Sequence, residues 1–124
     1  MKYRSKFEER VAEVLNGLKI AYEYETHKLK YTVPSKDHVY TPDFIIFNKR
    51  GKPIYLEVKG YLDALTRKKM IWVKESNPKL DIRFIFMQDN PIMKGSSTYY
   101  SDWAKKNGFK YTIGKDLPTK WLKE

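Results

Sequence analysis

The chain has 124 residues and a formal net charge of +10, from 25 Lys and Arg against 15 Asp and Glu. This length fits one domain over residues 1–124, and 41% hydrophobic with 15% aromatic residues excludes disorder over most of the chain. Because the chain has no cysteine, disulfide frameworks, thiolate nucleophiles and cysteine-based zinc sites are excluded.

The excess of basic residues indicates a polyanionic partner, most often nucleic acid. No apolar stretch is long enough to span a membrane, and the first ten residues lack the apolar segment of a signal peptide. A chain this short also leaves no room for an elaborate internal cofactor site. We therefore expect a cytoplasmic protein with no membrane partner and no small organic cofactor.

The first predicted element is a helix, because apolar residues recur at helical spacing at Phe7, Val11, Val14, Leu15 and Leu18. Ser5 and Glu8 have the spacing of a capping box, and Asn16-Gly17 is a plausible end. Alternation over residues 21–33 predicts one or two extended segments. Residues 34–38 are expected to form a polar loop.

The remaining pattern predicts strands and helices in turn, which indicates a mixed α/β fold with a sheet covered by helices. The expected elements are a strand at 39–47 with Pro42 at an edge or bulge, a turn at 48–53, a strand at 54–59, a helix from 63 or 66 to 76, a strand at 81–87, a helix at 98–107 and a short element at 117–122.

The chemistry is expected where the strands at 39–47 and 54–59 pair as a hairpin, which brings Asp43 close to Glu57. Side chains alternate along a strand, so Glu57 and Lys59 share one face. Carboxylates suit Mg²⁺ or Mn²⁺, one or two per site, and the backbone carbonyl of Val58 is a further candidate ligand. Such a site is suited to phosphodiester hydrolysis, with Lys59 orienting or deprotonating water or neutralising charge on the phosphate.

Pro42-Asp43 followed by Glu57-x-Lys59 also matches the PD-(D/E)xK signature of restriction-type nucleases. The signature alone is weak, since acidic residues followed by ExK arise by chance in Lys-rich chains. Two alternatives stay open on these residues: a restriction- or repair-type nuclease acting on linear or mismatched duplex, and a basic DNA-binding module without catalysis.

Further segments, in the same order, resemble the bacteriophage endonuclease I family, the Holliday-junction-resolving nucleases of the T-odd phages. They are SKFEERV, Tyr40-Thr41-Pro42-Asp43-Phe44, Leu56-Glu57-Val58-Lys59-Gly60, Arg67-Lys68-Lys69, Leu80-Asp81-Ile82-Arg83, Lys94-Gly95-Ser96 and Trp121-Leu122-Lys123-Glu124.

The resemblance implies a restriction-endonuclease-like mixed central sheet flanked by helices and an intertwined homodimer that exchanges its first helix. It implies a metal-dependent nuclease that resolves four-way junctions and other branched DNA, in host cytoplasm if phage-encoded. Asp43 and Glu57 would be the metal-binding carboxylates, Lys59 the catalytic lysine and Glu8 a further acidic residue that also reaches the metal.

Helical spacing supports Glu8 independently, since it borders the apolar stripe with Val11 and Leu15, whereas Glu9 lies on the solvated face. The alternative for Glu8 is a capping role alone. Six basic residues are expected to contact DNA: Arg67, Lys68, Lys69, Lys28, Lys30 and Lys94. The alternative is that these side chains are solvent-exposed and contact no DNA. The turn between Asp43 and Glu57 is longer than in the family, and the terminal extensions of the family are expected to be missing.

Overall fold

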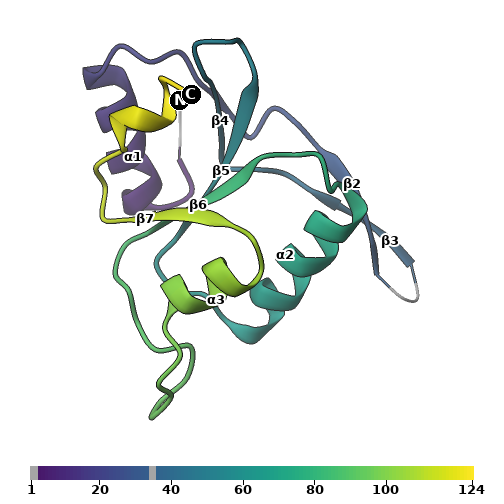
Figure 1. The fold of residues 1–124 in the computed structure, drawn as a ribbon. Helices are drawn as coiled ribbons and strands as arrows, with labels where there is room; N and C mark the ends of the chain where they lie inside the picture. The colour runs from purple at the N-terminus through teal and green to yellow at the C-terminus, as the bar shows by residue number, and fades with distance from the viewer. Residues whose placement is uncertain (1–2, 34–35) are drawn as a thin grey trace.

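A computed structural model describes residues 3–33 and 36–124, without the side chains of residues 32–38. Figure 1 shows the elements, which are α1 (Lys6–Gly17), β1 (Glu23–Tyr24), β2 (Leu29–Val33), β3 (Lys36–Tyr40), β4 (Phe44–Phe47), β5 (Pro53–Lys59), α2 (Ala64–Ser76), β6 (Ile82–Phe86), α3 (Tyr100–Lys106), β7 (Lys110–Ile113) and the 3₁₀ helix η1 (Thr119–Trp121). No helix in this part of the chain is long and apolar enough to cross a membrane.

The central sheet has five strands in the order β1-β4-β5-β6-β7. β4 pairs antiparallel with β1 and β5, whereas β5, β6 and β7 are parallel. A parallel pair needs a long crossover, which α2 supplies between β5 and β6. A second sheet contains only β2 and β3. The expected mixed α/β architecture, with a mixed sheet flanked by helices, is confirmed.

Helices cover both faces of the central sheet, because its strands alternate between two apolar faces (Figure 1). On one face Phe44 and Leu56 pack beneath α1 together with Trp121 of η1. On the other face Ile45 and Tyr55 belong to the core cluster formed with α2 and α3. The β4–β5 pair therefore lies between two apolar layers. Polar side chains at its end, next to the Phe44–Leu56 pair, can contact residues from both layers.

Side-chain caps start the two longer helices where the sequence predicts. Ser5 Oγ accepts the backbone N–H of Glu8 at 3.0 Å and begins α1. Asp63 Oδ1 accepts the N–H of Thr66 at 2.8 Å and begins α2, which selects the earlier of the two predicted starts. Both predicted helix ends are also confirmed, at Gly17 and at Ser76.

The predicted loop at residues 34–38 is wrong for Lys36 to His38, which belong to β3; Pro34 and Ser35 lie outside the described residues. β3 pairs antiparallel with β2, with Tyr31 opposite His38. Polar composition suggested a loop, but the hydrogen-bonding partner strand decides the conformation of such a segment.

The single strand predicted at 39–47 is also wrong, because it is broken at Thr41-Pro42-Asp43. β3 and β4 belong to different sheets, and Pro42, which has no N–H to donate to a neighbouring strand, lies in the break between them. Asp43 therefore lies just before β4 and is not part of a strand. Its own N–H still donates to the Leu56 carbonyl at 3.2 Å, which keeps it beside β5.

Differences at the C-terminal end are smaller. The predicted helix at 98–107 is α3, shorter at Tyr100–Lys106, and the element at 117–122 is reduced to η1. β7 was not predicted, because its four residues are half-exposed and only their parallel pairing with β6 makes them a strand.

Candidate active site

Glu8 is buried at the start of α1, with 5% of its surface exposed. Its Oε1 accepts the backbone N–H of Arg4 at 3.1 Å and the hydroxyl of Tyr24 at 3.0 Å. The carboxylate therefore holds the N–H of the residue before the cap, and not the N–H of Ser5 that the predicted capping box would use. Only the Ser5 half of the box forms, and the carboxylate of Glu8 lies in one group with that of Asp43.

Asp43 is the centre of the acidic group and is 2% exposed. Its Oδ2 accepts the backbone N–H of Val58 at 2.8 Å, and its Oδ1 lies 3.3 Å from Nη2 of Arg4. Burial, then repulsion from Glu57 and a hydrogen bond shared with Glu8, raise the pKa of Asp43 to about 9. Without a bound cation, Asp43 therefore favours its protonated form at neutral pH.

Glu57 and Lys59 lie on β5 beside Asp43, as the hairpin predicts. Phe44 pairs with Leu56, so the next positions along the two strands are Asp43 and Glu57. Glu57 Oε1 accepts the hydroxyl of the buried Tyr40 at 2.7 Å, and Oε2 lies 3.3 Å from Nζ of Lys59. Each oxygen of the buried carboxylate thus has one partner, which leaves it acceptor capacity, whereas the side chain of Lys59 is 27% exposed.

Among the described residues, three carboxylates lie close enough together to share a metal ion: those of Glu8, Asp43 and Glu25, whose ligand oxygens are within 4.8 Å of one another. Glu57 is not part of this group among the described residues. Its partner Tyr40 packs in the cluster under α2 and α3, whereas Glu8 comes from α1 on the opposite face. Asp43, which interacts with both acids, joins the two halves of the site.

Glu25 was not predicted as a site residue. It follows β1 with a left-handed backbone (φ 51°), and its N–H donates to the Asp43 carbonyl at 3.2 Å. This position results from the pairing of Tyr24 with Phe44, which are twenty residues apart. The alternation around Glu25 indicated an extended segment, but no local signal indicated which strand would receive it.

The site opens into a hollow of about 290 Å³ that contains both acidic and basic groups. Its lining is formed by Arg4, Ser5, Glu8, Asp43, Val58, Lys59, Gly60 and Tyr61. Hard oxygen donors in this number and this closeness fit a divalent metal ion, which is bound through carboxylates and water. The arrangement can therefore hold such a cation with an ammonium group alongside.

A second hollow of about 330 Å³ adjoins the first and is lined by Arg4, Glu25, Lys28, Val39, Thr41 and Lys69. It brings together two of the predicted DNA contacts, Lys28 and Lys69. Lys69 Nζ also lies over the ring of Tyr40, 5.5 Å from its centre, so it is held beside the Glu57 side of the site.

The other predicted DNA contacts are placed differently. Arg67 uses Nη1 to bind the carbonyls of Leu62 at 2.8 Å and Ile92 at 3.3 Å, which ties the start of α2 to the loop before α3. Lys30, Lys68 and Lys94 are exposed. These side chains remain predicted contacts, with Arg67 mainly engaged by the protein itself.

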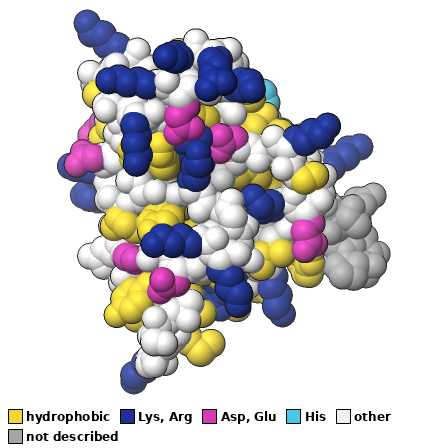
Figure 2. All heavy atoms as spheres, viewed as in Figure 1, with side chains coloured by type: hydrophobic (Ala, Val, Ile, Leu, Met, Phe, Trp, Pro, Cys, Tyr) yellow, Lys and Arg dark blue, Asp and Glu magenta, His cyan; other side chains and the backbone are white. Residues whose placement is uncertain are grey.

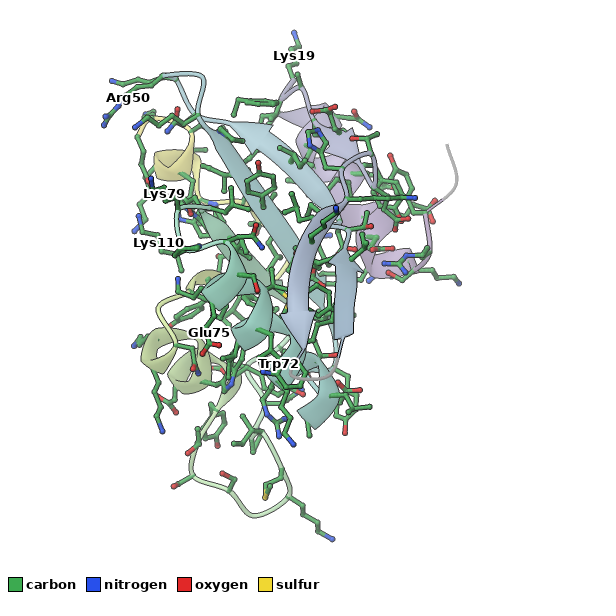
Figure 3. All side chains as sticks on the ribbon, turned by 90° about the vertical axis from the view of Figure 1, so that its right-hand side faces the viewer. Lys19, Arg50, Trp72, Glu75, Lys79 and Lys110 are labelled. Carbon is green, nitrogen blue, oxygen red and sulfur yellow. The ribbon has the colours of Figure 1, made fainter. Side chains whose placement is uncertain are left out.

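Basic side chains are not confined to the site. Figure 2 shows Lys and Arg over most of one face, more densely in its upper part, with a few acidic side chains between them. In Figure 3, Lys19 and Arg50 point away from the body of the protein. Charge alone therefore does not single out one face of the protein as a place for a polyanion.

Comparison with known proteins supplies the family. A model of the family described as Phage endonuclease I matches residues 1–124. Endonuclease I of Escherichia phage T7 is 37% identical over 123 residues, which cover 98% of this chain and 79% of that protein. Endodeoxyribonuclease 1 of Enterobacteria phage T3 is also 37% identical over 123 residues, covering 98% of this chain and 78% of that protein.

A structure titled "Structure of EndoMS-dsDNA2 complex" is a more distant match, with a TM-score of 0.43 and 14% sequence identity over 91% of this chain and 46% of that chain. A likeness at that level says nothing about activity. The sequence matches extend from the first helix to the last residues and include the segments that carry Glu8, Asp43 and Glu57. The chain therefore belongs to the phage endonuclease I family.

Proposed function

We propose that this protein is a metal-dependent DNA endonuclease that resolves four-way junctions and other branched DNA. The observation that carries the proposal is the buried Asp43, which interacts with Glu8 on one side and with Glu57 on the other at an open hollow. The names of the two phage relatives, an endonuclease and an endodeoxyribonuclease, support DNA as the substrate. The net charge of +10 favours binding to a polyanion.

In this proposal Asp43, Glu57 and Glu8 hold Mg²⁺, with Mn²⁺ as a substitute and one or two ions per site. Glu25, the third carboxylate of the close acidic group, is a further candidate ligand. The carbonyl of Val58 is a further oxygen ligand. When bound, the cation supplies polarisation of the phosphodiester and compensation of charge on the leaving oxygen. Glu8 and Asp43 come from different layers of the fold, so the intact tertiary structure is needed to bring these ligands together.

Lys59 lies at the rim of the hollow, with Nζ held 3.3 Å from Glu57. This position suits it to contact the attacking water or to neutralise charge that builds on a phosphate oxygen. Hydrolysis consumes one water molecule and breaks one P–O bond, which leaves a phosphate monoester and a hydroxyl group. Tyr40 keeps Glu57 oriented through its hydroxyl, so the carboxylate holds Lys59 in place.

We further propose that the protein acts as a homodimer in the cytoplasm of the host cell. Two active sites on one dimer would cut two opposed strands of a four-way junction. In the single chain α1 packs against its own sheet and places Glu8 beside Asp43. An exchange of α1 between two copies would make the same contacts with a partner, and light scattering at micromolar protein would reveal the dimer.

The test is nicking of a four-way junction with and without Mg²⁺, beside a linear duplex of the same sequences. We expect Glu57→Gln and Lys59→Ala to lower the cleavage rate by about 10²- to 10⁴-fold. Matched controls are Glu75→Gln and Lys79→Ala, which remove the same charges from exposed positions (Figure 3). Equal cutting by all four variants would contradict the site assignment.

Comparison of the junction with the linear duplex separates the other two candidate functions. Faster cutting of the linear duplex than of the junction would favour a restriction- or repair-type nuclease. Salt-sensitive binding with no cutting in Mg²⁺ or Mn²⁺ would leave only a DNA-binding module.

A further inference from the structure

Arg4 lies at the edge of the acidic group, just before the residue that caps α1. Its backbone N–H donates to Glu8 Oε1 at 3.1 Å and to the Tyr24 hydroxyl at 3.0 Å. The main chain of Arg4 is therefore fixed to the site. Its side chain, in contrast, is 69% exposed, so the guanidinium can move without disturbing the packed core.

The guanidinium of Arg4 pairs with two of the three clustered carboxylates. Nε lies 2.6 Å from Glu25 Oε2, and Nη2 lies 3.3 Å from Asp43 Oδ1. The other oxygen of Asp43 is held by the N–H of Val58. Arg4 thus contacts the Asp43 oxygen that has no backbone donor, at the place where the proposed cation would bind.

We propose that Arg4 is a displaceable counter-ion of the active site, which gives up Asp43 when a divalent cation enters and then binds a DNA phosphate. The inference rests on the proposed function. Two positive groups compete for the same carboxylate oxygens, so the guanidinium and the cation exclude each other at Asp43. Before the cation arrives, Arg4 balances the charge of Glu25 and occupies the cation's place beside the protonated Asp43. The entering cation would displace both the proton of Asp43 and the guanidinium, which would stay close by afterwards.

The second hollow receives the displaced side chain. Arg4 lines both hollows, and the second one also contains Lys28, Lys69 and the carboxylate of Glu25, which holds Nε of Arg4 at 2.6 Å. The planar guanidinium binds phosphate oxygens in a bidentate manner, which the two lysines cannot do. A phosphate group held there would lie immediately beside the acidic group, so cation entry and DNA binding would be coupled through one residue.

The first experiment measures Mg²⁺ and Mn²⁺ binding by calorimetry in the absence of DNA. Arg4→Gln is compared with Lys6→Gln, which removes the same charge from an exposed position two residues away. We expect Arg4→Gln to bind the cation about threefold to tenfold more tightly than Lys6→Gln and the unchanged protein. Equal or weaker binding by Arg4→Gln would overturn the inference, because only general electrostatics would then act.

The second experiment follows Arg4 directly, through the Nε–H resonance of its side chain. We expect this signal to shift during Mg²⁺ titration with the same midpoint as in calorimetry, and Arg4→Gln identifies it by its loss. A signal that does not respond to saturating Mg²⁺ would overturn displacement.

The third experiment measures junction binding in Ca²⁺ at several salt concentrations. Loss of one phosphate contact in Arg4→Gln should reduce the slope of log affinity against log salt by about 1 relative to Lys6→Gln. Equal slopes would overturn the phosphate role.

Failure of the inference differs from failure of the proposed function. A protein that cuts junctions in Mg²⁺, but whose Arg4→Gln variant binds Mg²⁺ no more tightly, refutes only the role of Arg4. Absence of both cation binding and cutting in the unchanged protein and in Arg4→Gln would refute both.

Discussion

Replacement of Asp43 by asparagine tests how the buried acid is held before a cation binds. Asp43 is 2% exposed, and burial together with Glu57 and Glu8 raises its pKa to about 9. In an unfolded chain the pKa of an aspartic acid is about 3.9. Between these two values the folded protein keeps a proton that the unfolded chain has released.

The sign of the effect on stability follows from proton linkage. Because the folded state binds the additional proton, stability is highest below the unfolded pKa and falls as pH rises towards the folded pKa. One proton corresponds to about 1.4 kcal/mol of unfolding free energy per pH unit. An asparagine side chain cannot ionise, and at this position its oxygen can still accept from Val58. Its amide N–H₂ takes the place of Oδ1, where it can donate to Glu8, and the exposed guanidinium of Arg4, also a donor, must turn away from it. We therefore expect the stability advantage of Asp43→Asn to grow by about 1 kcal/mol per pH unit between about pH 5 and about pH 8.

The assay is urea denaturation in EDTA across that pH range, with Asp116→Asn, an exposed aspartate, as the matched control. Added Mg²⁺ should stabilise the unchanged protein but not Asp43→Asn, because a ligand that binds only the folded state raises its stability. A difference between Asp43→Asn and the unchanged protein that stays constant with pH would refute the reasoning. Junction cleavage by Asp43→Asn should also be lost.

Three further predictions concern groups that support the site or the fold. Tyr40→Phe removes the hydroxyl that donates to buried Glu57 at 2.7 Å, and we expect it to lower the free energy of unfolding by about 1–3 kcal/mol; an unchanged urea midpoint would contradict this. Arg83 lowers the pKa of Glu124 from 4.5 to about 2, so this stabilisation is present above 4.5 and is lost as pH falls towards 2. In Glu124→Gln the melting temperature should therefore fall less steeply as pH decreases from 4.5 towards 2. The same fall in both proteins would argue against a stabilising Arg83–Glu124 pair. Ser5→Ala should cost about 1 kcal/mol of stability and Ser5→Gly only a few tenths, as measured in urea; equal losses would show that capping is not the cause.

Local sequence patterns were sufficient to predict those helices and strands in which apolar residues recur at regular spacing. The apolar stripe of α1, the Ser5 cap and the paired strands β4 and β5 all follow from spacing over a few residues. The nearness of Asp43 to Glu57 follows from the same hairpin. Such features are predictable because one face of a helix or strand must be buried, and the period of the sequence identifies that face.

The other features of the site depend on pairing between segments that are distant in sequence. Such pairing cannot be predicted from local periodicity, because the partner segment lies outside the local pattern. The break at Thr41-Pro42-Asp43 exists because β3 and β4 join different sheets. Glu25 enters the acidic group only because β1 pairs with β4, and Arg4 reaches Asp43 because α1 packs on that face. The sequence alone determined which carboxylates and which lysine lie together on the hairpin. Only the tertiary structure decided which further charges surround them, because those charges arrive on elements that the hairpin pattern does not contain.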